Sequence, residues 1–473
     1  MDLHISLDAT QGLSRQIYEQ IRQATLDGRL PGGTRMPSTR ELAKSLGIAR
    51  NTVATAFDHL VAEGHLCARP GVGTFVSDDA DRNQRPQQLT DSSLTPVPLW
   101  RRTTPVVPPP MTPHPAFDFS SGIPDDSRFP YATWRRLVAD GFRRTTNAAL
   151  YGEPAGPVEL RRAIALHLGT SRGLQIGPED IVVTSGVQQA ASLIASVLVE
   201  PGDVVAVEEP GYPAVRRAFE VARARVVGTP VDEHGLVVDQ LPHDAKLVYV
   251  TPAHQFPLGV RMSLPRRRAL VGWARSRNAA IVEDDYDTDF RYGGRPVDPL
   301  HALEGGGSVL YVGSFSKSLL PALRVGYVVA PPAIRDALRR ARFVADWQGT
   351  TPVQLALARF MENGGLAAHI RRMRREYERR RVLIGTLLGR SFARHLETLP
   401  NVAGLHLAAW ARDATPDEVR GWVRAAAGEG VAVQAIGDFA DTEVRPGLVL
   451  GFGGIPLERI EEGLRRLQRI VGP

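Results

Sequence analysis

The stretch Val309–Tyr327, VLYVGSFSKSLLPALRVGY, decides how most of this chain folds and what it can bind. It begins as an apolar strand and turns through small residues that include Ser314, Ser316 and Lys317. Arg324 follows seven residues after the lysine. In open α/β sheets, ligands bind at the carboxyl ends of the strands, where this turn falls. Two hydroxyls and an arginine favour a phosphate, and a lysine beside them can form a Schiff base.

Lysine is rare in this chain, so its positions are informative. Of the 57 basic residues, only Lys44, Lys246 and Lys317 are lysines. Arginine serves as the ordinary surface cation, and it cannot form a Schiff base as lysine can. We therefore interpret Lys317 as a reactive residue.

Five further apolar strands are predicted around this stretch, and they alternate with amphipathic helices. With Val309–Gly313, the predicted strands are Asp180–Thr184, Val204–Glu208, Leu247–Thr251, Ala279–Asp284 and Val325–Ala330. Continuous Val, Ile and Leu strands that alternate with helices favour a mostly parallel sheet with helices on both faces. The fold class of this region is therefore α/β.

Polar groups follow two of these strands. Residues 185–187, SGV, lead from a strand into a helix, where free backbone N–H groups favour a phosphate. Residues 283–287, EDDYD, close another strand with four acids and a tyrosine. Either segment alone is a weak signal, because solvated strand ends and small-residue turns also occur without ligands.

Residues 1–77 have a different pattern, of short helices followed by a β-like pair. The predicted helices are Leu13–Leu30, a second that runs to Leu46 with Ser38 as its N-cap, and a third that begins at Arg50 and buries Val53, Phe57, Leu60 and Val61. Ser38 with Glu41 forms a capping box, and Gly47 provides the turn. His65–Val76 is predicted to be a two-stranded wing.

This N-terminal pattern, PSTRELAKSLGIARNTVATAFDHLVAEG followed by RPGVGTFV, resembles the winged helix-turn-helix of GntR-type bacterial regulators over residues 12–77. The resemblance implies double-stranded operator DNA as a partner, with contacts at the helix starts and wing tip from Arg40, Arg50, Asn51, Thr52 and Gly73. Arginine and asparagine suit bidentate contacts with base edges. Net charge does not decide the matter, since residues 1–77 hold eight Arg and Lys against seven Asp and Glu. A protein-binding module with solvated helix ends is the alternative.

The later segments, in their order along the chain, resemble the fold type I aminotransferases, which use pyridoxal 5′-phosphate. With the N-terminal module, the whole chain resembles the MocR subfamily of GntR-type regulators. This implies a multidomain protein: a winged helix-turn-helix at residues 1–77, a linker at 78–115 that contains nine prolines, and an aminotransferase-like domain at 116–473. The last would hold a mostly parallel sheet and a smaller α+β subdomain, bind the effector and form a homodimer.

The resemblance also implies roles for single residues around pyridoxal 5′-phosphate, with no metal. Lys317 would form the Schiff base, Asp284 would bind the pyridinium nitrogen, and Tyr286 would hydrogen-bond the phenolic oxygen. The phosphate would be held by Ser185, Gly186, Val187, Ser314, Ser316 and Arg324. Three more residues complete the set: Tyr212 near the ring, Tyr151 reaching the partner subunit's phosphate, and Arg445 binding a ligand carboxylate.

One position departs from the aminotransferase pattern. Phe256, in TPAHQFPLG, stands where many aminotransferases have an asparagine that bonds the cofactor's phenolic oxygen. This disfavours efficient transamination and leaves cofactor binding intact. We therefore expect a transcriptional regulator that responds to an amine, an amino acid or pyridoxal 5′-phosphate itself, and not a physiological enzyme. The alternatives are an active class I/II aminotransferase with an accessory DNA-binding module, and a DNA-binding protein whose second domain holds no cofactor.

Composition sets outer limits on these readings. The 473 residues are 43% hydrophobic and 23% charged, as in ordinary globular proteins. No apolar run approaches the roughly 20 residues that span a bilayer, and the N-terminus does not resemble a signal peptide. Cys67 is the only cysteine, which excludes an intrachain disulfide. We expect a cytoplasmic protein without a membrane partner. Residues 371–381, RRMRREYERRR, are interpreted as a solvated helix or as an auxiliary surface for DNA phosphates.

Overall fold

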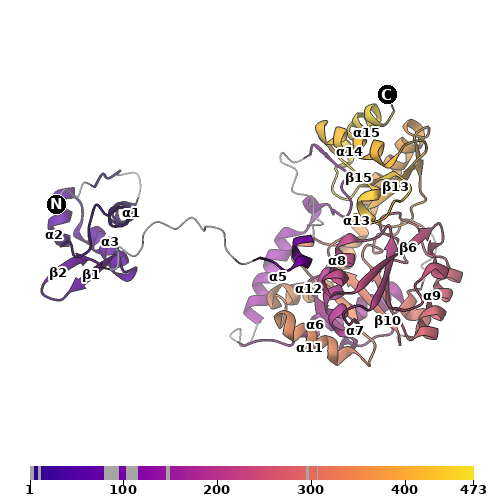
Figure 1. Cartoon of the computed structure of the whole chain (residues 1–473), viewed down its shortest axis with the longest axis horizontal. Coiled ribbons are helices and arrows are strands. Elements are labelled where there is room, and N and C mark those ends of the chain that lie inside the picture. The colour runs from indigo at the N-terminus through magenta and orange to yellow at the C-terminus, as the bar shows by residue number, and fades with distance from the viewer. Residues whose placement is uncertain are drawn as a thin grey trace. The chain divides into compact units, whose positions relative to one another are not determined.

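The computed structural model describes residues 5–8, 12–78, 95–102, 115–144, 150–293, 298–305 and 307–472. The chain divides into two compact units, Met1–Arg101 and Arg102–Pro473. Most of the predicted linker at 78–115 lies outside the described residues. Figure 1 shows the elements of each unit.

The first unit is a helix-turn-helix with a wing. Its elements are α1 (Leu13–Leu26), α2 (Thr39–Leu46), α3 (Arg50–Ala62), β1 (Leu66–Arg69) and β2 (Gly73–Val76), the last two paired antiparallel. α1 ends four residues before the predicted Leu30, because Gly28 takes a φ of +71° and turns the chain. Val61 was expected in the core, but it is 37% exposed, while Leu60 beside it is fully buried.

The turn between α2 and α3 follows the predicted local rules. The Ser38 side chain accepts a hydrogen bond from Glu41 N, and the Glu41 carboxylate accepts one from Ser38 N at 2.9 Å. Gly47 ends α2 with a φ of +65°, a conformation that is cheap only for glycine. The capping box and the glycine turn are confirmed.

The second unit contains an eight-stranded sheet in the order β4-β11-β10-β9-β8-β5-β6-β7. The strands are β4 (Ile181–Thr184), β5 (Val204–Glu209), β6 (Arg225–Asp232), β7 (Gly235–Leu236), β8 (Ala245–Val250), β9 (Ala280–Asp285), β10 (Val309–Ser314) and β11 (Gly326–Val329). Only β11 and β7 run against the other strands. The predicted mostly parallel sheet is confirmed.

Helices cover both faces of this sheet, so the central strands are buried at nearly every position, with successive side chains on opposite faces. One face packs on α5 (Tyr131–Arg144), α6 (Val158–Arg172), α9 (Leu264–Arg277) and α12 (Thr351–Glu362). The other packs on α7 (Val187–Leu198), α8 (Pro213–Val221) and α11 (Arg335–Asp346). In β10, for example, Tyr311 joins the first layer, and Leu310 and Val312 join the second. The short helix α10 (Leu300–Glu304) adds the buried Leu300 to the first of these faces, and a short helix α4 (Pro98–Arg102) spans the boundary between the two units.

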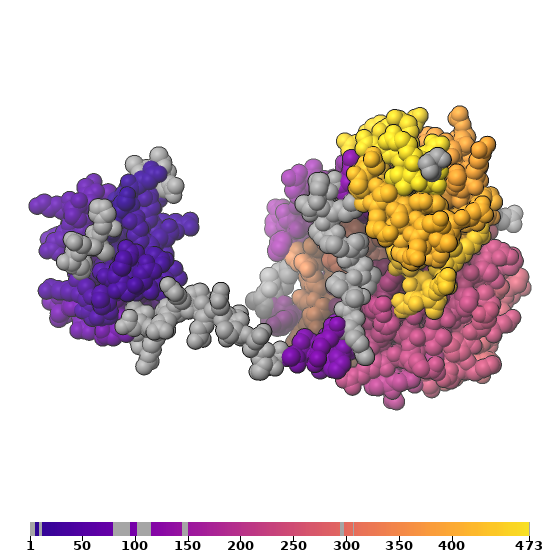
Figure 2. Space-filling view, turned by 45° about the horizontal axis from the view of Figure 1, so that its top comes forward, coloured from indigo at the N-terminus to yellow at the C-terminus, as the bar shows by residue number. Residues whose placement is uncertain are grey.

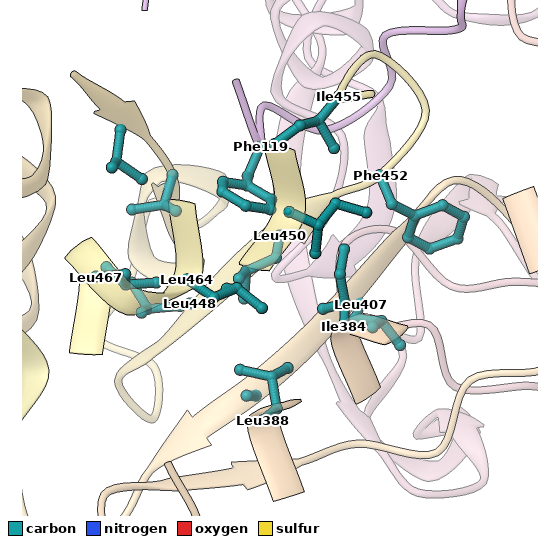
Figure 3. Packing of buried hydrophobic residues seen from close by; sticks show 14 of the residues in the cluster. Phe119, Ile384, Leu388, Leu407, Leu448, Leu450, Phe452, Ile455, Leu464 and Leu467 are labelled. Atoms are coloured by element: carbon teal, nitrogen blue, oxygen red, sulfur yellow. The ribbon is translucent and has the colours of Figure 1, made fainter. Parts of the chain in front are cut away.

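A smaller α+β subdomain follows. Its four-stranded antiparallel sheet has the order β12-β13-β16-β15, from β12 (Leu396–Thr398), β13 (His406–Ala411), β15 (Gln434–Ala435) and β16 (Gly447–Gly451). Its helices are α13 (Gly365–Ser391), α14 (Pro416–Gly428) and α15 (Leu457–Val471). A parallel pair, β3 (Phe117–Asp118) with β14 (Val431–Ala432), brings the start of the unit into this subdomain. Figure 3 shows Phe119 packed with Leu450 and Ile455 in its core, and Figure 2 shows the subdomain seated on the larger one.

The arginine-rich stretch 371–381 lies in α13, where some of its arginines are buried or paired and others are exposed. Arg380 is buried and pairs with Asp125 at 2.5 Å. Arg379 and Arg381 pair with glutamates of the same helix, whereas Arg371 and Arg374 are exposed. Among the described residues, no helix is both long enough and apolar enough to cross a membrane.

Candidate functional site

Lys317 lies just past the carboxyl end of β10, in a partly buried position. Its Nζ donates a hydrogen bond to the carbonyl oxygen of Gly122 at 2.7 Å. Burial lowers the pKa of the lysine, and the nearby carboxylates of Asp287 and Asp284 partly oppose this shift. A lowered pKa increases the fraction of neutral, nucleophilic amine, which is what Schiff-base chemistry requires.

Asp284 lies at the end of β9, the strand beside β10. It is buried, and the Tyr249 hydroxyl donates a hydrogen bond to its Oδ2. Its Oδ1 has no hydrogen-bond partner within the described part of the chain. Burial raises the pKa of this carboxyl to about 7, against the Tyr249 hydrogen bond, which lowers it. A buried carboxylate oxygen without a partner fits a protonated ring nitrogen, because an unmet acceptor is costly.

The opposite end of the site can hold an anion. Gly186, at the start of α7, takes a φ of +95°, and a Cβ there would lie 3.2 Å from both terminal nitrogens of Arg324. The first turn of α7, which begins at Val187, has no side-chain cap, so its N–H groups are available for a phosphate. Ser314 Oγ lies 2.9 Å from Ser316 Oγ. The geometry therefore favours a phosphate between the α7 start and Arg324.

A cavity of about 390 Å³ adjoins this end and is lined by Ser185, Arg324 and Tyr151, among others. Tyr151 is 72% exposed and stacks on Trp347, with ring centroids 4.3 Å apart. Within this chain, Tyr151 and Arg324 thus line the same cavity.

Aromatic rings form the wall between the two subdomains. Phe256 makes edge contacts with Tyr212 at 5.7 Å, with Tyr286 at 6.0 Å and with Phe439 of the smaller subdomain at 4.9 Å. The Tyr286 hydroxyl lies 3.0 Å from His254 Nδ1, and the same nitrogen lies 3.0 Å from an oxygen of Asp287. The predicted Tyr286 therefore belongs to a buried hydrogen-bonded cluster.

Several residues of this site were not predicted from the sequence. Gly122 has a φ of +76°, and its position is so close to Lys317 that a Cβ would lie 2.6 Å from Nζ. Tyr249 supports Asp284, and Glu208 at the end of β5 is buried beside them. The sequence contains no motif for Gly122, because its partner is 195 positions away. Tyr249 is the middle residue of the predicted strand Leu247–Thr251, and its hydroxyl within an otherwise apolar strand was the available signal.

Arg445 does not lie where a ligand carboxylate was expected. Its side chain is half exposed and pairs with Glu397 at 2.8 Å. Its guanidinium also packs over the Trp410 ring, 5.4 Å from the centroid. The VRPG segment that carries it is a surface loop before β16, so its charge is satisfied at the surface of the smaller subdomain.

Four of the candidate DNA-binding residues, Arg40, Arg50, Asn51 and Gly73, are exposed in the first unit, and Thr52 is half-buried. Arg40 is in the first turn of α2, and Arg50, Asn51 and Thr52 form the first turn of α3. Arg50 Nε donates to Thr39 Oγ1 at 3.4 Å, which links the two helix starts. Gly73, with a φ of +133°, begins β2 in the wing.

The wing also holds a residue that the motif did not indicate. Arg35 donates a hydrogen bond to Val72 O at 3.0 Å, and its guanidinium lies against Gly73. This contact places a third exposed arginine near the helix starts.

Comparisons with known proteins agree with both halves of this geometry. The family described as aminotransferase class I and II matches residues 115–418, and the family of bacterial regulatory proteins, gntR family, matches residues 13–76. The probable rhizopine catabolism regulatory protein MocR of Rhizobium meliloti is 36% identical, over 98% of this chain and 95% of its own. The pyridoxine biosynthesis transcriptional regulator PdxR of Corynebacterium glutamicum is 34% identical, over 96% and 95%.

Solved structures resemble the second unit. An archaeal alanine:glyoxylate aminotransferase has a TM-score of 0.71 at 27% identity, over 75% of this chain and 90% of its own. A kynurenine aminotransferase from Pyrococcus horikoshii has a TM-score of 0.69 at 29% identity, over the same shares. The expected fold type I architecture is confirmed.

Proposed function

The chain belongs to the MocR-type regulators, transcriptional regulators that join a GntR-family DNA-binding domain to an aminotransferase class I and II domain, and we propose that its Lys317 site is the sensor. The effector is an amine, an amino acid or pyridoxal 5′-phosphate itself. One observation carries the proposal: Lys317, the unpaired Asp284 Oδ1 and Arg324 meet at the carboxyl edge of one sheet. A regulator of this kind works in the cytoplasm, where its operator DNA is.

The residues around Lys317 fit pyridoxal 5′-phosphate. Lys317 would hold the aldehyde carbon covalently, Asp284 Oδ1 would accept the ring N–H, and Arg324 with the α7 start would bind the phosphate. When bound, the cofactor supplies an aldehyde that reacts reversibly with primary amines. The chain's own part is to lower the pKa of the Lys317 amine by burial, which increases its neutral fraction, and to exclude water with its aromatic wall.

The position of Phe256 favours sensing over turnover. Its ring fills the junction between the subdomains through contacts with Tyr212 and Phe439. A phenyl ring cannot hydrogen-bond the cofactor's phenolic oxygen. An effector that enters between these rings would shift the balance between two subdomain arrangements and alter DNA binding.

We also propose a homodimer. Val344, Leu150 and Tyr151 are exposed by 81%, 68% and 72%, and Tyr151 stacks on Trp347. Monomeric proteins rarely expose large contiguous apolar patches, so a second copy of this chain is a suitable cover. Its Tyr151 would then lie near the neighbouring phosphate site.

The cofactor assignment is tested by chemical trapping. Protein saturated with pyridoxal 5′-phosphate is reduced with borohydride, digested and analysed by mass spectrometry. We expect the added mass on the peptide that contains Lys317. An adduct confined to Lys44 or Lys246 overturns the assignment, and those two residues serve as internal controls within the same digest.

A further inference from the structure

A second, smaller cavity of about 190 Å³ lies where the larger subdomain meets the smaller one. Its inner wall comes from the end of β5 and the start of α8, with Glu208, Tyr212 and Tyr249. Its outer wall is the loop that begins with the 3-10 turn η6 (Ile436–Phe439). We call it the Glu208 pocket. It borders the candidate cofactor site, because Tyr249 also donates to Asp284.

Glu208 presents an unmet hydrogen-bond acceptor in this pocket. Its side chain is only 2% exposed. Thr251 N donates to its Oε2 at 3.1 Å, and Gln255 Nε2 lies 3.4 Å from the same oxygen. Its Oε1 has no partner among the described residues. Buried acceptors are rarely left unpaired, and Glu208, once ionised above its raised pKa of about 7, accepts hydrogen bonds without donating any. The occupant that fits this oxygen is therefore a hydrogen-bond donor.

The charges around the pocket favour a cation. Its two arginines are already neutralised: Arg216 by Glu209 and Asp441, and Arg217 by Glu220 and Asp441. Among the described residues Glu208 has no ion-pair partner, and Asp438 on the opposite wall accepts a backbone N–H from Ala435. A carboxylate ligand would find both arginines already paired with acids, and the carboxylates of Glu208 and Asp438 would repel it.

We propose that the Glu208 pocket binds a substituted ammonium group, so that the effector is a polyamine-like cation and not an amino acid recognised by its carboxylate. This inference rests on the proposed function of the Lys317 site and narrows its effector class. The surface position of Arg445, paired with Glu397, agrees with it, because the arginine expected for a ligand carboxylate faces elsewhere.

The pocket is placed to connect ligand binding to domain arrangement. Gly211 N donates to Phe439 O at 2.9 Å, and Glu209 accepts hydrogen bonds from the backbone N–H groups of Asp441 and Thr442. These contacts join the two subdomains at the rim of the pocket. A cation bound to Glu208 beneath Phe439 would add to them and favour the joined arrangement.

Trimethylammonium is the probe, because a tertiary amine donates one N–H and cannot form a Schiff base. It is titrated by isothermal calorimetry into cofactor-loaded full-length protein at a pH of about 8.5, above the raised pKa of Glu208, so that the carboxylate is ionised. We expect binding to the wild type and a loss of at least tenfold in affinity for Glu208→Gln, an isosteric change that keeps an acceptor for Thr251. Glu233→Gln removes an equally negative but exposed side chain outside the pocket, and should bind as the wild type does.

Acetate serves as the anionic comparison. Equal affinity of trimethylammonium for wild type and Glu208→Gln, no binding to the wild type, or acetate binding that Glu208→Gln strengthens by removing repulsion would each overturn the proposal. Thermal melting of Glu208→Gln shows that the variant is folded. The trapping experiment stays independent: a missing Lys317 adduct with intact trimethylammonium binding refutes the cofactor assignment alone. A normal adduct without binding refutes the pocket alone.

Discussion

The two units of this protein recognise their partners in opposite ways. The helix-turn-helix unit carries its candidate contacts on exposed helix starts, and these are set by interactions a few residues apart, such as Ser38 with Glu41. The Lys317 site is buried and is assembled from distant segments. Lys317, for example, donates a hydrogen bond to the carbonyl of Gly122, 195 positions away. The positions of the exposed DNA-binding residues thus follow from interactions within a few residues. The geometry of the buried Lys317 site depends on contacts between segments that are far apart in the sequence.

The largest expected effect is a decrease in the stability of the second unit as pH rises, caused by its buried Glu208. Burial raises the pKa of Glu208 from 4.5 to about 7. Between those values the unfolded chain has lost a proton that the folded chain keeps, so the free energy of unfolding falls as pH rises. The loss is on the order of 3 kcal/mol for Glu208 and is complete above pH 7. Urea melts of cofactor-free protein from pH 4 to 8 measure it, and Glu208→Gln should reduce the slope.

The first unit should respond to pH in the opposite direction. His65 is buried there, and burial lowers its pKa below the ordinary 6.5. Its unfolded form therefore binds a proton that the folded form does not, and stability decreases as pH falls through 6.5. Melts of residues 1–101 would show this trend. A unit that becomes less stable as pH rises over the same interval would break the contrast.

The second prediction concerns exposed recognition. Arg50→Ala should weaken specific operator binding by roughly 1–3 kcal/mol, because it removes a guanidinium able to reach a base edge. Cofactor binding, followed by absorbance, should not change. Arg15→Ala is the matched control, since Arg15 is an exposed arginine of α1 that pairs with Glu19. If Arg50→Ala weakens binding to operator and random DNA equally, Arg50 contacts phosphate only.

The third prediction concerns buried recognition. Asp284→Ala should weaken retention of pyridoxal 5′-phosphate by about 1–3 kcal/mol, because the ring N–H loses its acceptor in a buried site. Dialysis followed by absorbance measures the retained cofactor. Asp289→Ala, which removes a nearby carboxylate paired with Arg172, provides the comparison for a general effect of lost charge. Equal cofactor loss in both variants would contradict the assigned role.

The smallest expected effect concerns the N-cap of α2 in the first unit. Ser38→Ala removes the α2 N-cap and should destabilise the first unit by about 1 kcal/mol. The melting of the second unit should stay the same, since the two are separate compact units. Differential scanning calorimetry resolves the two transitions, and a shift of both would show that the units unfold together.

The same contrast explains what the sequence could predict. The strands, the helix-turn-helix and the positions of Lys317, Asp284 and Arg324 follow from periodicity and from polar residues at strand ends. Gly122 and Glu208 could not be predicted, because their roles arise from segments that meet only in the folded sheet. The pairing of Arg445 with Glu397 at the surface could not be predicted, because an arginine in a loop can face either a ligand or solvent. The prediction that Val61 is buried was wrong for a similar reason. The apolar stripe of α3 extends past the surface that α1 covers, and Val61 lies in the uncovered part.

Control of the DNA-binding unit by the Lys317 site is the core of the proposed function. It is tested most directly by fluorescence anisotropy of operator DNA with wild-type protein and Lys317→Ala, with and without a diamine, at one salt concentration. We expect the diamine to change operator affinity of the wild type at least fivefold, and to leave that of Lys317→Ala unchanged while its operator binding persists. A full diamine response in Lys317→Ala would contradict the claim.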